Sequence, residues 1–277
     1  PMQHLTLRIT QQTEDQIAIR LMDANGREQD RRALPSHEVR TWLRQIFRYA
    51  IVHGYVDTNP ASDLDAVAAL QPPVKHNPIL RKDDLGEFVR RLRAFPGSPV
   101  AKAGIQLLLL TGVRTAELRY ASPDQFDLEA GLWRVPADTV KQLKKRVRLE
   151  GDAVPDYIVP LSKQAVDIVR ELKFQYGSYP YLLPGRNDPT KTISENTLNV
   201  GIKSIGYEGR LTGHGIRGTL STALYEAGYT SARVEAQLSH ADQNAVRGSY
   251  NHAEYVEQRA GMMQAWADML DELAAQA

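Results

Sequence analysis

The stretch QLLLLTGVRTAEL, residues 106–118, is the part of the sequence that decides the fold. Its run of leucines predicts a buried helix, and Gly112 provides the turn that ends it. Arg114 follows directly, so its guanidinium would emerge from a rigid helix junction. A lone arginine is most often one half of a surface salt bridge. Arg114 is therefore a candidate binding residue only if other parts of the chain supply matching groups.

The stretch HGIR, residues 214–217, supplies two such groups. His214 stands three residues before Arg217, which places both on nearly the same face of a helix. Two guanidinium groups can bind the non-bridging oxygens of one phosphate, and they stabilise the extra charge of a five-coordinate phosphorus transition state. The imidazole of His214 can exchange protons at about pH 7. The plainer interpretation of His214 is a histidine that caps a helix or satisfies a core.

A candidate nucleophile follows the stretch LSH, residues 238–240. Tyr250 stands ten residues beyond His240. A phenol with a free pKa of about 10 is a weak nucleophile at neutral pH, so attack on phosphorus requires proton removal and a cationic site. The chain contains 12 tyrosines, most of them better explained by packing, and Tyr255 is the nearest competitor. The residues alone therefore leave the choice of tyrosine open.

Together these stretches resemble the phage-integrase family of tyrosine recombinases. The match covers roughly residues 77–270 and keeps residue type, order and approximate spacing, which is far more specific than any single motif. The resemblance implies a mainly α catalytic domain with a small antiparallel β-sheet (α+β). It also implies that the protein cuts and rejoins DNA through a covalent 3′-phosphotyrosine at Tyr250, in a phosphate site formed by Arg114, His214, Arg217 and His240.

The family carries a lysine in a β turn that protonates the departing 5′ oxygen. Lys141, shortly after a predicted strand at residues 133–135, matches this lysine, and Lys144 is the alternative. The cluster of Lys144, Lys145 and Arg146 can equally be a nonspecific phosphate-binding patch.

Glu117 lies three residues after Arg114, where the family also has an acidic residue. Its carboxylate could hold a guanidinium or an imidazole in place without being a catalyst. Two-metal nucleases require clustered carboxylates, whereas this set has one glutamate among cationic groups, so we expect no metal. The sequence has no GxxxxGK[ST] loop, and exchanging a phosphodiester for a phosphotyrosyl ester needs no ATP. We therefore expect no cofactor.

The composition sets wider limits. At 277 residues, with 42% hydrophobic and 24% charged residues, the chain is typical of a globular protein with one large or two modest domains. A net charge of +1 means that any DNA contact must come from local patches. The absence of cysteine excludes disulfides, thiolate nucleophiles and cysteine-ligated zinc. Without an apolar stretch of membrane-spanning length or a leader pattern, we expect a cytoplasmic protein that joins the nucleoid when bound to DNA.

The N-terminal third has a different organisation. Alternating residues at 4–10 and 16–22, with a turn at 23–26, predict an antiparallel β element of unknown role within residues 1–35. Residues 36–70 resemble the last part of the family's DNA clamp, with a helix predicted at 37–54. Proline-rich residues 71–82 predict a linker. The predicted helix carries three arginines four residues apart, which either follow a phosphate backbone or form a solvated face: Arg40, Arg44 and Arg48.

The catalytic domain is expected at residues 83–277. Its predicted helices are 85–92, 100–110, 163–174, 194–205, 218–229 and 232–238, and residues 133–135 and 157–160 are predicted to pair as strands. Beyond Tyr250 an apolar stripe predicts a further helix, which either packs on its own core or, as in the family, docks on a neighbouring subunit: Val256, Met262, Met263, Trp266, Met269, Leu270 and Leu273.

The leading hypothesis is a site-specific recombinase or integrase of a mobile genetic element. The resemblance implies that four protomers act on two DNA duplexes, with accessory DNA-bending or directionality proteins as candidate partners. The family usually carries a complete four-helix clamp, of which only the last part is recognisable here. Two alternatives stay open. The first is a type IB topoisomerase, in which the same chemistry religates the original strand, and the second, suggested by the shortened clamp, is a truncated DNA-binding remnant without catalysis.

Overall fold

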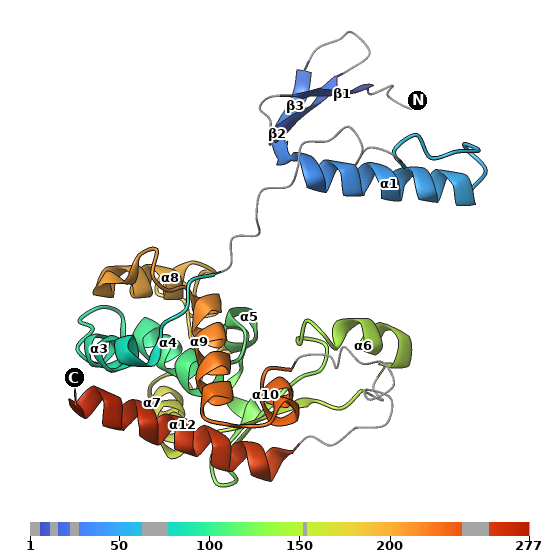
Figure 1. The fold of residues 1–277 in the computed structure, drawn as a ribbon. Coiled ribbons are helices and arrows are strands. Elements are labelled where there is room, and N and C mark those ends of the chain that lie inside the picture. The colour runs from blue at the N-terminus through green and yellow to red at the C-terminus, as the bar shows by residue number, and fades with distance from the viewer. Residues whose placement is uncertain are drawn as a thin grey trace. The chain divides into compact units, whose positions relative to one another are not determined.

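The computed structural model describes residues 6–11, 16–22, 28–62, 77–151, 154–239 and 255–276. The chain divides into two units, Pro1–Lys75 and His76–Ala277, each with its own secondary structure (Figure 1). Among the described residues, no helix combines the length and the apolar character needed to cross a bilayer. The domain limits drawn from the sequence stay a prediction.

The first unit contains a three-stranded antiparallel sheet and one long helix. The strands β1 (Thr6–Gln11), β2 (Gln16–Met22) and β3 (Glu28–Pro35) lie in the order β1-β2-β3. The first two lie where the alternation predicts them, whereas β3 was not predicted, because its charged sequence EQDRRALP lacks an apolar alternation and it forms by main-chain pairing with β2. The predicted turn at residues 23–26 lies outside the described residues.

The helix α1 (Ser36–Val52) follows β3 directly and agrees closely with the predicted helix. Apolar side chains recur along it at helical spacing, a pattern that predicts one buried face. That face is covered only in part, since Val39 is buried whereas Ile46 and Ile51 have exposed fractions of 60% and 39%.

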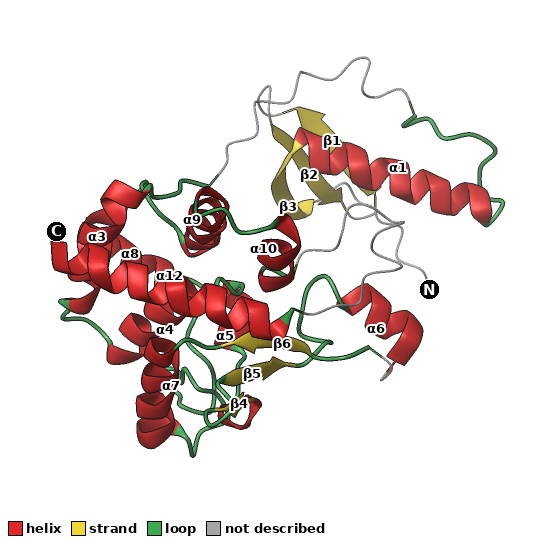
Figure 2. Ribbon diagram, turned by 60° about the horizontal axis from the view of Figure 1, so that its bottom comes forward, coloured by secondary structure: helices red, strands yellow, loops and turns green. Residues whose placement is uncertain are grey.

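The second unit is mainly helical around a small antiparallel sheet, as the sequence predicts (Figure 2). The sheet has the order β4-β5-β6, formed by Phe126–Asp127, Leu132–Val135 and Tyr157–Pro160, with Trp133 opposite Val159. The helices are α3 (Lys82–Arg93), α4 (Pro99–Thr111), α5 (Thr115–Arg119), α6 (Lys144–Glu150), α7 (Lys163–Tyr176), α8 (Thr197–Ile202), α9 (Gly213–Glu226), α10 (Ser231–Gln237) and α12 (Val256–Gln276).

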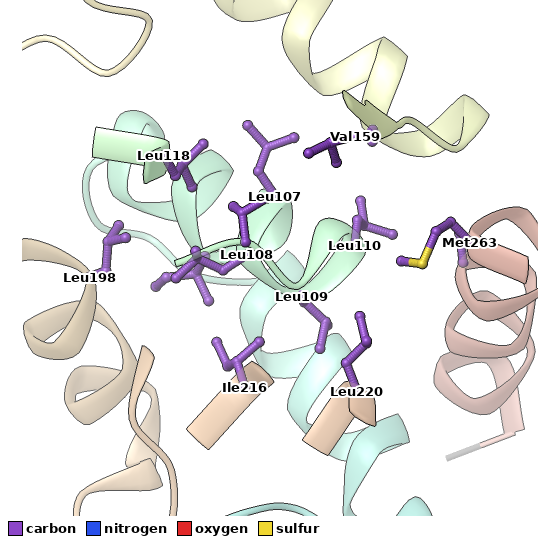
Figure 3. Packing of buried hydrophobic residues seen from close by; sticks show 14 of the residues in the cluster. Leu107, Leu108, Leu109, Leu110, Leu118, Val159, Leu198, Ile216, Leu220 and Met263 are labelled. Atoms are coloured by element: carbon purple, nitrogen blue, oxygen red, sulfur yellow. The ribbon is translucent and has the colours of Figure 1, made fainter. Parts of the chain in front are cut away.

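The helix α4 is the centre of this unit. Nine of its 13 residues are buried, and it contacts α7, α8, α9 and α12. Figure 3 shows its leucines, Leu107 to Leu110, surrounded by side chains of several elements, among them Leu198 of α8, Leu220 of α9 and Met263 of α12. Each fully buried leucine side chain contributes about 2 kcal/mol of hydrophobic stabilisation. The C-terminal end of α4 is therefore a rigid base for the residues that follow it.

Three differences from the predicted helices have local causes. The predicted helix at residues 194–205 is divided into α8 and a π-helical turn, Lys203–Tyr207, because Gly206 adopts a φ of 91°. The helix α9 begins five residues earlier than predicted, since the side chain of Thr212 accepts a hydrogen bond from the Gly215 N–H at 2.9 Å. The lysine-rich connection contains α6, stabilised by an Arg146–Glu150 pair one turn apart.

The helix α12 packs on its own unit, against α3, α4, α10 and β6. Its buried side chains include Met262, Met263, Trp266 and Leu270. The indole Nε1 of Trp266 donates a hydrogen bond to the Leu109 carbonyl of α4 at 2.8 Å. This packing agrees with one of the two interpretations of the apolar stripe, and docking on a neighbouring subunit stays a prediction.

Candidate active site

Arg114 lies at the junction of α4 and α5. The helix α4 ends at Gly112, whose φ of 67° is in the left-handed region that favours glycine. A Cβ at this position would also lie 3.2 Å from the side chain of Leu220. The next residue, Val113, is 1% exposed and anchors the turn in the core. Arg114, the N-cap residue of α5, therefore emerges from the core at a position fixed by this turn.

Glu117 fixes the orientation of Arg114. One carboxylate oxygen of Glu117 accepts a hydrogen bond from the Arg114 backbone N–H at 2.8 Å, and the other accepts one from Arg114 Nη1 at 2.7 Å. The Glu117 side chain is 1% exposed, and the Arg114 side chain is 15% exposed. A charge-assisted pair in such a position restricts the guanidinium to one orientation while leaving it an accessible edge.

Arg217 lies on the second turn of α9 and is buried, with 5% of its surface exposed. Its Nη1 donates to the Gly112 carbonyl at 2.6 Å, and its Nη2 donates to the Leu238 carbonyl. Burial, together with the nearby positive charge of Arg114, lowers the pKa of Arg217 to about 10. Both effects disfavour having two positively charged guanidinium groups side by side unless an anion is also bound. An oxyanion bound between the two guanidinium groups would offset that cost.

Three successive carbonyl groups at the end of α10 connect these arginines. The Gln237 carbonyl accepts a hydrogen bond from the Tyr157 hydroxyl, and the Leu238 carbonyl accepts from Arg217. The Ser239 carbonyl accepts from Arg114 Nη2 at 3.5 Å. We call these three groups the carbonyl ladder. The ladder directly precedes His240, so the arginines contact the chain where it enters the segment with the candidate nucleophile.

His214 is exposed and is the second residue of α9, one turn before Arg217. The helix-capping interpretation does not apply to it, because Thr212 provides the cap. His240 and Tyr250 lie outside the described residues, so their roles stay predictions. The competitor Tyr255 is partly buried, and its carbonyl accepts the backbone N–H of Arg259 at 2.8 Å.

The basic cluster after β5 lies on α6 and in the turn before it. Lys141 is exposed in that turn, and Lys144 is the exposed first residue of α6. Arg146 is paired with Glu150 at 3.1 Å, and this hydrogen bond lowers the pKa of the Glu150 carboxyl. For Lys145, only the backbone position within α6 is described. The choice between Lys141 and Lys144 as the general acid stays open.

The three arginines of α1 do not share one environment. Arg44 donates from Nε to the Ala61 carbonyl at 3.1 Å and from Nη2 to the Ser62 carbonyl at 2.9 Å. It therefore holds the segment that follows the helix. Arg40 is partly buried and Arg48 is exposed. A row of three equivalent phosphate contacts on α1 stays a prediction.

Sequence reasoning missed three buried polar residues behind the arginines: Tyr157, Gln237 and Arg259. The Gln237 side chain donates from Nε2 to the Thr111 carbonyl at 2.8 Å and accepts from Arg259 Nη1 at 3.2 Å. Arg259 is 1% exposed on α12. The burial of Arg259 could have been predicted from its spacing. It precedes Met262, Met263 and Trp266 by three, four and seven residues, which places it on the same buried face of the helix.

The titration of Tyr157 provides a first prediction. Burial raises the pKa of its hydroxyl to about 12, against the opposing effects of Arg259, Arg217 and Arg114. The unfolded chain would release this proton at about pH 10, so the contribution of Tyr157 to stability is present below that pH and is lost as the pH rises towards 12. Between pH 9 and 11 we expect the wild type to lose about 1.4 kcal/mol more unfolding free energy than Tyr157→Phe, measured with urea. Parallel pH profiles of the two proteins would contradict this assignment.

The class of protein follows from these features. A leucine-rich central helix ends at a glycine, and two arginines lie beside this glycine, in a mainly helical domain with a small sheet. His214 precedes one of these arginines, Arg217, by one helical turn. Among the described residues, no three His, Asp or Glu side chains gather where they could hold a metal ion. The model of the phage integrase family matches residues 78–257, and the chain therefore belongs to that family.

Individual relatives extend the similarity beyond the matched residues. The chain is 38% identical to the integrase of Enterobacteria phage P4 over 262 residues, which cover 91% of this chain and 57% of that protein. It is 36% identical to the integrase of Shigella phage Sf6, covering 92% of this chain and 63% of that protein. The chain thus spans less than two thirds of the length of these relatives.

Solved structures share the fold at lower identity. The Tn1549 transposon integrase, in complex with circular intermediate DNA, aligns with a TM-score of 0.55 and 18% identity, covering 82% of this chain and 77% of that chain. At this identity the likeness shows the fold, which is the mainly helical architecture described above.

Proposed function

We propose that the protein is a site-specific DNA recombinase of the integrase type, which cleaves and rejoins DNA strands through a covalent phosphotyrosine at Tyr250. The observation that carries the proposal is the convergence of Arg114 and Arg217 on residues 238 and 239. These residues lead into the segment that contains His240 and Tyr250. The names of the relatives, which are integrases of phages P4 and Sf6, support the same activity.

In the proposed reaction the Tyr250 hydroxyl gives its proton to His214 as its oxygen attacks a DNA phosphorus, and the bond to the 5′ oxygen breaks. The departing oxygen takes a proton from Lys141 or Lys144, and the phosphate is left as a 3′-phosphotyrosyl ester. Arg114 and Arg217 bind the non-bridging oxygens and stabilise the charge of the transition state. His214 and His240 complete the site as hydrogen-bond donors or proton carriers. A free 5′ hydroxyl of another strand then attacks the ester, which releases Tyr250 and joins the strands without a cofactor.

The partner of this reaction is double-stranded DNA, and the solved Tn1549 integrase is a neighbour of the same fold that is bound to DNA. Exchange of strands between two duplexes requires two cleavages on each duplex, so we propose four protomers at work. Accessory DNA-bending or directionality proteins would bias the outcome between integration and excision. The protein would work where the DNA is, at the nucleoid in the cytoplasm.

The proposal is tested with a pool of short duplexes with randomised centres, each nicked so that the cleaved fragment diffuses away. We expect the wild type to form a protein–DNA adduct that survives denaturing electrophoresis, Tyr250→Phe to form none, and Tyr255→Phe to form it normally. An adduct that persists in Tyr250→Phe would exclude this nucleophile. DNA binding by the wild type without any adduct would instead indicate a non-catalytic protein.

A further inference from the structure

We propose that Arg259, Gln237 and Tyr157 are positioning residues that hold Arg114 and Arg217 in place and make their arrangement depend on the position of α12. We call this set the buried relay. The inference rests on the proposed function, since it assigns the two arginines to a DNA phosphate. It concerns side chains that approach the arginines from the protein interior.

Gln237 is the centre of the buried relay. It is 0% exposed, and its side chain and main chain contact three different elements. Its Nε2 donates to the carbonyl of Thr111, the last residue of α4, at 2.8 Å. The adjacent carbonyl, that of Gly112, accepts from Arg217 at 2.6 Å. Gln237 and Arg217 therefore hold two neighbouring peptide groups of the turn that leads to Arg114.

Tyr157 holds the main chain of the same glutamine. Its hydroxyl, at the start of β6, donates to the Gln237 carbonyl, which is the first group of the carbonyl ladder. The second and third groups of the ladder accept from Arg217 and Arg114. Because the three carbonyls are consecutive, a shift of Gln237 displaces the acceptors of both arginines.

Arg259 connects this arrangement to α12. Its Nη1 donates to Gln237 Oε1 at 3.2 Å, and the residue is 1% exposed. Burial of a guanidinium is costly, and an apolar residue of similar size would pack at this position without that cost. Its presence therefore indicates a role in orientation. Arg259 stands nine residues after Tyr250, on the helix that begins at Val256. A movement of this end of α12 would reach Gln237 and then both arginines.

The relay is tested in the full chain with Arg259→Met, which has a similar length but no donor. The matched control is Trp266→Phe, which also removes a buried hydrogen bond between α12 and its surroundings, from Trp266 to the Leu109 carbonyl at 2.8 Å. The control does not alter a contact of the carbonyl ladder. Tyr157→Phe removes only the hydroxyl that donates to the Gln237 carbonyl, and it carries the same test if Arg259→Met does not fold.

The first measurement is amide hydrogen exchange of residues 111–118, which needs no DNA. We expect about ten-fold faster exchange in Arg259→Met than in Trp266→Phe, because the relay holds this turn directly.

The second measurement is the single-turnover rate of adduct formation at saturating DNA. We expect the rate to fall by about 10- to 100-fold with the Kd for DNA within about two-fold of the wild type, and Arg259→Lys to restore part of it.

The outcomes separate the two proposals. Equal exchange of residues 111–118 in Arg259→Met and Trp266→Phe overturns the relay, and so does adduct formation by Arg259→Met at the wild-type rate. Absence of an adduct in the wild type, with the predicted difference in exchange, overturns the proposed function and leaves the positioning of Arg114 and Arg217 supported.

Discussion

Arg217→Lys is expected to lower the rate of adduct formation by about 10²- to 10³-fold, the effect of removing one preorganised donor from a transition-state site. Lysine keeps the positive charge, but it has one nitrogen, whereas Arg217 donates to both the Gly112 and the Leu238 carbonyls. A lysine ammonium that donates to these carbonyls cannot also present a planar fork to a phosphate. The measurement is the single-turnover rate on the nicked duplex pool, with the Kd for DNA determined separately.

The matched control for Arg217→Lys is Arg170→Lys. Arg170 lies on α7 with a 60% exposed side chain paired with Asp167, so this replacement should leave adduct formation and stability close to the wild type. A thermal unfolding curve accompanies both variants, because two buried carbonyls lose a donor only in Arg217→Lys. If Arg217→Lys reacted within about three-fold of the wild type, Arg217 would not bind the reacting phosphate.

The part of the site that sequence can predict is the part encoded by short spacings. Two pairs of site residues are three residues apart in the sequence: Arg114 with Glu117, and His214 with Arg217. Helical geometry places residues at this spacing on one side of a turn. The glycine that ends α4 is equally local, since its positive φ has a recognisable sequence preference. The helices that surround the site follow from apolar periodicity for the same reason.

In the buried relay only Arg259 has such a signature, from its place in the apolar stripe of α12. The Tyr157 hydroxyl, like the Arg217 guanidinium, donates to a main-chain carbonyl, and every residue type carries a carbonyl. The acceptors lie 80 and 21 residues away in sequence, so no local pattern records the contact. In the first unit the limit is different. The strand β3 is held by main-chain pairing with β2, and its charged sequence EQDRRALP carries no strand pattern.

Glu117→Ala is expected to reduce both stability and activity more than any surface substitution. Removing one partner of a buried ion pair leaves the other without compensation, and here Arg114 would lose acceptors for both its Nη1 and its backbone N–H. We expect a loss of about 3 kcal/mol in the free energy of unfolding, measured with urea. We also expect about 10- to 100-fold slower adduct formation, because the guanidinium is no longer held in one orientation.

Two further variants separate the charge of Glu117 from its shape. Glu117→Gln keeps an acceptor oxygen for Arg114 Nη1, but its amide nitrogen cannot accept from the Arg114 backbone N–H, so we expect a loss of about 2 kcal/mol. Asp167→Ala removes the carboxylate of an exposed pair with Arg170, whose side chains are 72% and 60% exposed, and should change neither property measurably. If Glu117→Ala were as stable and active as Asp167→Ala, the orientation of Arg114 would have to come from the Ser239 carbonyl. At 3.5 Å, that contact is at the limit of hydrogen bonding and too weak to hold a guanidinium alone.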